Sequence, residues 1–152
     1  MDDLDVTILH QLAADARTPL ARIAATVEVS TATIHQRVRR LRDRGVIRGY
    51  RLDVDWDAVG LPVSAIVSLQ VGDAAGLGAT AREISQVRWV ESCSAVTGEF
   101  DLMAVVRARS SAHLGEVLDD LRRRIPGASR TVVVLTSYFS GRLLPLGESH
   151  SP

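Results

Sequence analysis

Apolar residues in the first third of the chain recur at the spacing of one helix face. Three groups of such residues predict three helices. The groups are Leu4, Ile8, Leu9 and Leu12; Leu20, Ile23, Ala24 and Val27; and Ile34, Val38 and Leu41. Thr18 is predicted to cap the second helix, with Pro19 at its first position. Ser30 or Thr31 is placed to cap the third helix, and Gly45 is placed to end it.

The periodicity changes after Gly45. Residues 46–54 (VIRGYRLDV) alternate enough to predict a short hairpin with Gly49 at its tip. We therefore expect residues 1–55 to form three helices followed by a small β wing. The next segment, residues 56–62 (WDAVGLP), contains glycine and proline and is predicted to be a linker.

Strand and helix patterns alternate in residues 63–142. The first strand has one apolar side, formed by Val63, Ala65, Val67, Leu69 and Val71. A helix is predicted at about 77–87, and strands are predicted at 89–97 and 100–108, separated by a short turn at Gly98 and Glu99.

An amphipathic helix and a last strand complete this half. The helix has an apolar stripe formed by Leu114, Val117, Leu118, Leu121 and Ile125. It stops at Pro126 and Gly127, and residues 131–139 (TVVVLTSYF) predict the strand. The order βαββαβ is the ferredoxin-like arrangement, so the expected fold class is α+β. Residues 143–152 are predicted to be a flexible tail.

Two of the predicted strands are apolar at nearly every position, at 102–106 and at 132–135. Both faces of the sheet therefore need to be covered, and two helices can cover only one face. A second copy of the same sheet is the simplest cover for the other face. The pattern therefore predicts a homodimer.

Charge is distributed unevenly, although the chain has no formal net charge. Residues 1–16 contain four acids and no base, whereas residues 17–51 contain nine arginines against Glu28 and Asp43, a net charge of +7. Residues 52–152 contain nine arginines against twelve acids. A basic N-terminal segment of this kind favours nucleic acid as a partner.

The third predicted helix has the side chains that a DNA-reading helix needs. Gln36 and Arg39 point away from the apolar stripe, and both residue types make bidentate contacts with base edges. Hydroxyl and guanidinium groups contact phosphate. The predicted contacts with double-stranded DNA are Ser30, Thr31, Thr33, His35, Gln36, Arg37, Arg39 and Arg40, with Arg48 and Arg51 in the wing. The alternative is an arginine-rich helix face that is only solvated.

Other features narrow the compartment and the chemistry. Cys93 is the only cysteine, so no intrachain disulfide is possible and a reducing compartment is expected. The start, MDDLD, lacks the basic region of a signal peptide, and no apolar run approaches the length of a membrane span. Histidines, cysteines and carboxylates show no metal-ligand spacing. We expect a cytoplasmic protein with no metal and no cofactor.

Motifs in both halves resemble one family. The most specific, RVRRLRDRGVIRGY, is similar to the winged helix-turn-helix of the Lrp/AsnC (feast/famine) bacterial transcription regulators. The segments VESCSAVTGEFDLMAVVRA and VVVLTSYF resemble that family's ligand-sensing domain, and the likeness covers about residues 2–142. It implies DNA binding, sensing of amino acids or related metabolites, and homodimers that often assemble into tetramers or octamers. Many relatives have glycine where Glu28 stands.

The resemblance also implies a small-molecule site between dimers. Its expected residues are Thr97, Gly98, Glu99, Phe100, Asp101, Val134 and Thr136. Backbone N–H groups around Gly98 suit an α-carboxylate, and Asp101 suits an α-ammonium group. The alternative is that Gly98 serves only the turn and Asp101 only caps the hairpin.

The expected function is that of a sequence-specific DNA-binding transcriptional regulator that an amino acid or related metabolite modulates, and not that of an enzyme. Two alternatives remain at the level of the sequence. One is a tetrapyrrole-processing enzyme on the same scaffold, although the chain offers few polar groups for such a substrate. The other is a sensor without DNA binding, for which Glu28 is the one supporting feature.

Overall fold

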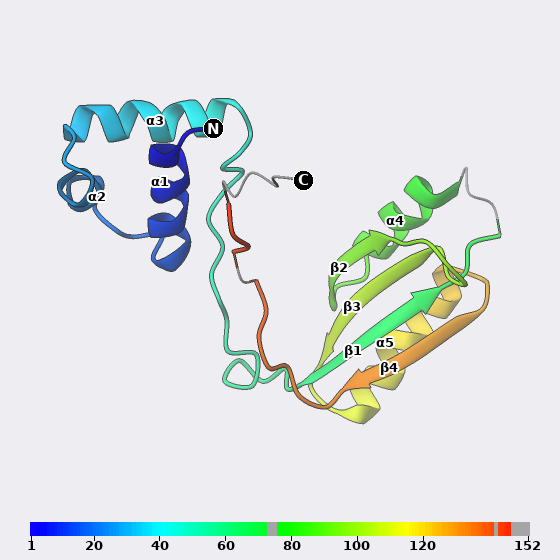
Figure 1. Ribbon diagram of the computed structural model, residues 1–152. Helices are drawn as coiled ribbons and strands as arrows, with labels where there is room; N and C mark the ends of the chain where they lie inside the picture. Colours follow the sequence, from blue (N-terminus) through cyan, green and yellow to red (C-terminus); the bar gives the residue numbers. More distant parts are fainter. Residues whose placement is uncertain (73–75, 142, 147–152) are drawn as a thin grey trace. The chain divides into compact units, whose positions relative to one another are not determined.

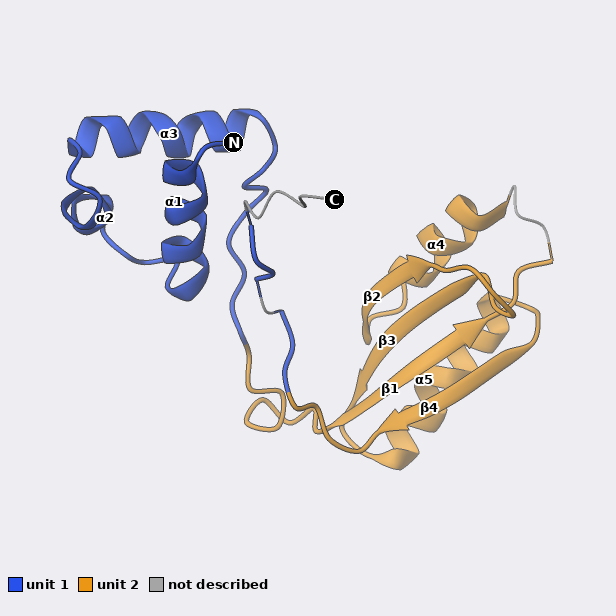
Figure 2. Ribbon diagram, in the orientation of Figure 1, with its two compact units in different colours: residues 1–53, 139–152 blue, residues 54–138 orange. Residues whose placement is uncertain are grey.

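The computed structural model describes residues 1–72, 76–141 and 143–146, so most of the predicted tail lies outside the described residues. The chain divides into two compact units (Figure 2). The N-terminal unit consists of Met1–Asp53 together with the chain from Phe139 onward, and the C-terminal unit is Val54–Tyr138. The described C-terminal residues therefore belong with the N-terminal unit.

Three helices form the N-terminal unit: α1 (Asp3–Ala14), α2 (Leu20–Thr26) and α3 (Thr31–Asp43). Helices α1 and α2 both pack against α3 (Figure 1). Their common core contains only residues from the predicted apolar stripes, namely Ile8, Leu12, Ile23, Ala24, Ile34, Val38 and Leu41. Burial of each large apolar side chain stabilises the unit by about 1.5–3 kcal/mol. The three predicted helices are confirmed.

Two of the helix starts differ in how they are capped. The Ser30 hydroxyl accepts a hydrogen bond from the backbone N–H of Thr33 at 3.1 Å, as the sequence predicts for α3. The prediction that Thr18 caps α2 is wrong, because Pro19 holds the N-cap position and makes no side-chain cap. The N–H of Thr18 instead donates to the carbonyl of Asp15 at 3.0 Å. Thr18 therefore belongs to the turn that precedes the cap.

The turn between α2 and α3 contains the only non-glycine residue with positive φ in the described part of the chain, Glu28 at φ 54°. A side chain with a β-carbon is disfavoured there by roughly 1–2 kcal/mol. The fold forms the helix-turn-helix turn in spite of this strain. Glycine would adopt the same conformation without steric cost.

Residues 46–54 form no strand, so the expected hairpin is absent from the wing position. After Gly45, at φ 69°, the backbone N–H groups of Val46 and Ile47 both donate to the carbonyl of Leu41, at 2.9 and 3.1 Å. These bonds satisfy the C-terminal end of α3. An isolated hairpin is marginally stable, and these N–H groups are already used.

The C-terminal unit contains β1 (Val63–Leu69), α4 (Leu77–Ser85), β2 (Val90–Ala95), β3 (Leu102–Ala108), α5 (Ser111–Arg124) and β4 (Ser129–Val134). The strands form one antiparallel sheet in the order β2-β3-β1-β4. The predicted βαββαβ order and the ferredoxin-like fold are confirmed.

Both helices of this unit cover the same face of the sheet (Figure 1). That face contributes alternate strand residues, among them Ala65 and Val67 of β1 and Ala104 and Val106 of β3. The helices contribute Ile84 from α4 and Leu114, Val117 and Leu121 from α5. The period-two pattern of the strands and the helical stripe therefore meet in one core.

The opposite face, here called the open face, has no element of the described C-terminal unit packed over its centre. Ile66 pairs in register with Val105 of β3 on one side and Val132 of β4 on the other. Val132 is 53% exposed and Met103, also on this face, is 39% exposed. An apolar row thus crosses three strands and faces outward, as the pattern of the strands predicts.

Two strand ends differ from the predicted bounds. Strand β4 stops at Val134, which pairs with Ser64 near the start of β1. Residues 135–139 therefore have no neighbouring strand to bond, and Leu135 is 94% exposed. The connection between β2 and β3 also spans residues 96–101, which is longer than the predicted two-residue turn.

Replacing Glu28 with glycine should stabilise the N-terminal unit. Relief of the left-handed strain, worth roughly 1–2 kcal/mol, exceeds the added backbone entropy cost of roughly 0.5–1 kcal/mol, so the midpoint of urea unfolding should rise. Glu28→Gln is the matched control, because it removes the charge and keeps the β-carbon. An equal stabilisation by both variants would show that charge, rather than backbone strain, is responsible.

Candidate nucleic-acid interface and effector site

Helix α3 presents one polar face away from the core. Thr31, His35, Gln36 and Arg39 are exposed, and Thr33 is half-buried, because its N–H and hydroxyl are bonded to Ser30. A depression of about 1170 Å³ opens beside this face and is lined by Thr33, His35, Gln36 and Arg39, with Tyr50 and residues of α1 and α2. The predicted readers of base edges are therefore accessible.

The five arginines predicted to contact DNA fall into two sets. Arg39 is 85% exposed, and its Nε lies 3.9 Å from the carboxylate of Asp43, a separation that holds it weakly. Arg48 and Arg51 are also exposed, in the extended segment that follows α3. These three exposed guanidinium groups are accessible to phosphate.

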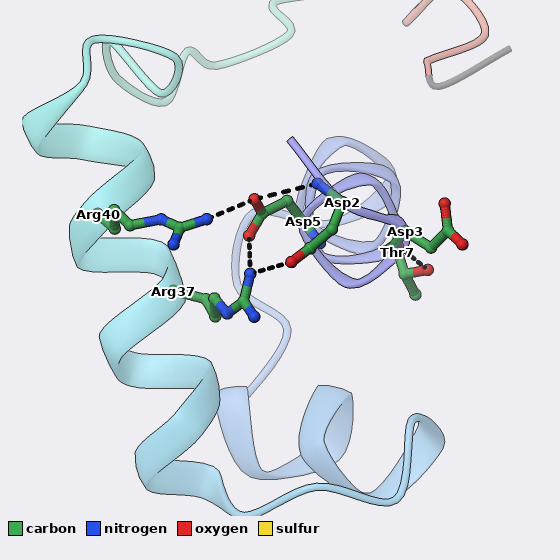
Figure 3. Close-up of polar contacts among 6 residues, drawn as sticks. All are labelled: Asp2, Asp3, Asp5, Thr7, Arg37 and Arg40. Carbon is green, nitrogen blue, oxygen red and sulfur yellow. Dashed lines mark hydrogen bonds and ion pairs between the residues drawn. The ribbon is translucent and has the colours of Figure 1, made fainter. Parts of the chain in front are cut away.

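Arg37 and Arg40 instead point toward α1 (Figure 3). The carboxylate of Asp5, which is 0% exposed, accepts from Nη1 of Arg37 at 3.2 Å and from Nη2 of Arg40 at 3.1 Å. Arg37 is also paired with Asp2. We call Asp2, Asp5, Arg37 and Arg40 the acid–arginine cluster.

Hydrogen bonds around the cluster favour its charged forms. The backbone N–H of Asp5 and then the guanidinium of Arg37 lower the pKa of the Asp2 carboxyl below its ordinary value. The hydrogen bonds to Asp2 and then to Asp5 raise the pKa of Arg37. Asp2 and Asp5 also form a capping box at the start of α1. Neither acid is among the predicted site residues, although a cap residue such as Asp2 followed three positions later by an acid, before an apolar run, resembles the sequence signature of a capping box.

Asp101 ties residues 96–101, which connect β2 to β3, to the end of β1. Its carboxylate accepts from the backbone N–H of Val71 at 2.7 Å, and its own N–H donates to the carbonyl of Leu69 at 3.0 Å. Its carbonyl accepts from Val96, also at 3.0 Å. Gly98, in the same connection, has φ 124° and open space where a side chain would be. Asp101 therefore holds the connection against β1, and Gly98 supplies a backbone conformation that the connection uses. Gly98 is also exposed.

Two charged side chains flank this connection. Nη2 of Arg130 lies 3.6 Å from Oε1 of Glu99, and the Arg130 guanidinium lies 5.4 Å from the ring centroid of Phe100. Glu99 and Arg130 are exposed, so this ion pair contributes little to stability.

The predicted effector residues lie at two ends of the sheet. Ser129 pairs with Leu69, next to the residue 97–101 connection, whereas Val134 pairs with Ser64 at the other end of β1. Five residues of strand separate these ends by about 17 Å. A single chain therefore does not bring Val134 and Thr136 to the residues at 97–101.

The described residues show neither a reactive thiol nor a metal site. Burial raises the pKa of the Cys93 thiol, which keeps it protonated and packed against the core of its unit. No group of three His, Cys, Asp or Glu side chains is arranged to hold a metal ion in residues 1–72, 76–141 and 143–146. Over the same residues, no helix has the length and apolar character needed to cross a membrane.

Comparisons with known proteins match both halves of the chain. Residues 1–42 match the AsnC-type helix-turn-helix domain, and residues 64–144 match the Lrp/AsnC ligand binding domain. The transcriptional regulator LrpA of Mycobacterium tuberculosis is 32% identical over 142 residues, which cover 93% of this chain and 95% of LrpA. AldR of the same organism is 38% identical over 116 residues, which cover 75% of this chain and 65% of AldR.

Solved structures agree with these matches. The feast or famine regulatory protein of Mycobacterium tuberculosis, complexed with L-methionine, superposes with a TM-score of 0.88 at 31% identity and covers 94% of this chain and 97% of its own. AsnC of Escherichia coli superposes with a TM-score of 0.86 at 28% identity and covers 95% and 99%. The chain belongs to the Lrp/AsnC family of transcriptional regulators, with a helix-turn-helix domain followed by a ligand-binding domain.

Proposed function

We propose that this regulator reads double-stranded DNA with α3, and that an amino acid or related small metabolite bound by the C-terminal unit modulates its DNA binding or assembly. The observation that supports the reader most directly is the division of α3. Its apolar stripe is fully used in the core, and its opposite side leaves Gln36 and Arg39 exposed. A helix of this kind suits the major groove.

Each predicted DNA residue has a role that its position permits. Thr33, His35 and Gln36 lie in the first two turns of α3, where a reading helix contacts base edges. Ser30 and Thr31 lie at the helix start, where backbone N–H groups favour phosphate. Arg39, Arg48 and Arg51 supply positive charge for the phosphate backbone. Arg37 and Arg40 are proposed below to act through α1.

A second copy of this chain is the proposed partner of the open face. The row of Val105, Ile66 and Val132 is apolar and directed outward, and an identical sheet supplies a matching surface. A homodimer presents two copies of α3, so its DNA site is expected to be roughly palindromic. We propose that dimers assemble further into a tetramer or octamer.

The effector site is proposed to lie between chains. Residues Thr97, Gly98, Glu99, Phe100 and Asp101 lie at one end of the sheet and Val134 and Thr136 lie toward the other, so one ligand meets both groups only where two chains meet. A relative of the same fold binds L-methionine, which supports an amino acid as the ligand. Such a site would couple ligand binding to assembly.

The competing functions have less support. The relatives reported above are named as regulators, which favours a non-enzymatic protein over a tetrapyrrole-processing enzyme. The sensor without DNA binding rested on Glu28, yet Glu28 adopts the left-handed conformation that the turn requires. We propose that the protein acts in the cytoplasm, where its DNA and free metabolites are accessible.

Two α3 variants test the DNA reader. Gln36→Ala should reduce discrimination between a selected site and random DNA by about 1–3 kcal/mol, the value of a bidentate base contact. Arg39→Gln should reduce the slope of log affinity against log salt by about one unit. Fluorescence anisotropy at several salt concentrations measures both. Arg82→Gln, on exposed α4, is the control; if the α3 variants bind as it does, α3 is not the reader.

A charge on the open face tests the dimer. Ile66→Arg would place an unpaired guanidinium in the centre of an apolar interface, which is strongly unfavourable. Sedimentation velocity should then show monomers where the native protein shows dimers or larger assemblies. Gln86→Arg adds the same charge at the exposed end of α4 and should leave the assembly intact. A native protein that sediments as a monomer would contradict the proposal.

Asp101→Asn tests the effector site. Asparagine retains an oxygen that accepts from Val71, so the unfolding temperature without ligand should stay close to native. A bound amino acid at 100 times its Kd adds about 2.7 kcal/mol of stability. In a thermal-shift panel of the twenty amino acids, the shift of a native hit should shrink in Asp101→Asn and persist in Glu116→Gln, on α5. An equal shift in all three proteins would leave Asp101 with its structural role alone.

A further inference from the structure

Helix α1 holds α3 through a charge that is removed from water. Asp5 is fully buried, with 0% exposure, and its two carboxylate oxygens are bonded to different arginines of α3 (Figure 3). Those arginines, Arg37 and Arg40, lie one turn apart on α3. Asp3, two positions away on α1, points away from the cluster and is exposed. The contact is therefore specific to one acid and two bases.

Stability alone does not account for this arrangement. Burial of a carboxylate costs several kcal/mol before its partners offset the penalty, and apolar residues of similar volume often serve a core at least as well. Apolar contacts such as those of Ile8 and Ile34 are non-directional, so they permit small rotations and slides of one helix on another. Two hydrogen-bonded ion pairs at successive turns restrain the rotation of α3 about its axis and its position along α1.

We propose that Asp5 is a positioning residue for DNA recognition, whose carboxylate holds Arg37 and Arg40 against α1 and thereby sets which side chains of α3 face the DNA. The inference rests on the proposed reading role of α3. The five arginines predicted to contact DNA then differ in function: Arg37 and Arg40 orient the helix, and Arg39, Arg48 and Arg51 meet phosphate. Arginines of the basic segment, residues 17–51, thus serve two purposes: orientation of α3 and contact with phosphate.

Arg37 has the stronger case of the two positioning arginines. Its side chain is half-buried and contacts both Asp2 and Asp5, whereas that of Arg40 is half-exposed and contacts Asp5 alone. Asp2 and Asp5 both bind the same nitrogen of Arg37, Nη1, so two negative charges already offset its positive charge. A phosphate that drew Arg37 away from α1 would leave the buried Asp5 with Arg40 alone, which is unfavourable. Arg37 is therefore expected to contribute little to phosphate binding while α1 and α3 are packed.

The test compares Asp5→Asn with Asp3→Asn, which removes the same charge from an exposed position of the same helix turn. Each full-length protein is titrated with a site selected from random DNA by the native protein, and with random DNA, at several salt concentrations and at a temperature where circular dichroism shows it folded. In Asp5→Asn, discrimination between the two DNAs should fall at least about tenfold, the equivalent of one base contact. The salt slope on random DNA should rise by about one unit, because Arg40 loses its only carboxylate partner while Arg37 keeps Asp2.

Arg37→Gln provides a second route if Asp5→Asn does not fold, since Asp5 keeps its bond to Arg40. It should lower discrimination and leave the salt slope on random DNA unchanged. A loss of about one unit of slope, as expected for Arg39→Gln, would show that Arg37 contacts phosphate and would overturn the proposal. So would Asp5→Asn binding that matches Asp3→Asn in discrimination and slope.

Different results would exclude the reading role of α3 and the positioning role of Asp5. Unchanged binding by Gln36→Ala and Arg39→Gln removes α3 as the reader. Effects of those two variants without an effect of Asp5→Asn remove only the positioning role.

Discussion

The pairing of Asp5 with Arg37 and Arg40 is the constraint on which the DNA-binding unit depends. A carboxylate that is closed off from water is stabilised by charged partners, and the two that Asp5 has on α3 favour one arrangement of α1 and α3 over its near alternatives. The apolar core beneath supplies most of the stabilisation but little direction. Orientation of the exposed face of α3 therefore comes from polar contacts, while cohesion comes from Ile8, Ile34 and their neighbours.

In the C-terminal unit, too, apolar packing supplies stability and polar contacts fix the position of a particular segment. Its core joins alternate strand residues to two helices on one face, and the other face remains apolar and outward. Asp101 then ties the residue 97–101 connection to the end of β1 through backbone groups of Leu69, Val71 and Val96. A connection held at three points is suited to receive a ligand without large rearrangement, because its entropy has already been reduced. The accessible Gly98 lies within it.

Separation of the effector residues within one chain bears on regulation. A ligand that needs both ends of the sheet binds only an assembled protein, so ligand binding and assembly are thermodynamically linked. The strand that contributes Val134 ends where β1 offers no further partner, and the chain beyond it returns to the N-terminal unit. The chain therefore passes between the two units twice, once before and once after the C-terminal unit in sequence.

Local patterns in the sequence were enough to predict the helices and the order of strands along the chain, because period and turn residues act over a few positions. The resemblance of its motifs indicated the family. The stripe of Ile34, Val38 and Leu41 and the cap at Ser30 needed no distant information. Residues 46–54 were different: alternation suggested a hairpin, but the carbonyl of Leu41 took the N–H groups of Val46 and Ile47. The exposed polar side of α3 could be read from the sequence, whereas the partners of Arg37 and Arg40 could not. Asp5 lies over thirty positions away, and only the packing of α1 on α3 decides which arginines pair with its buried carboxylate.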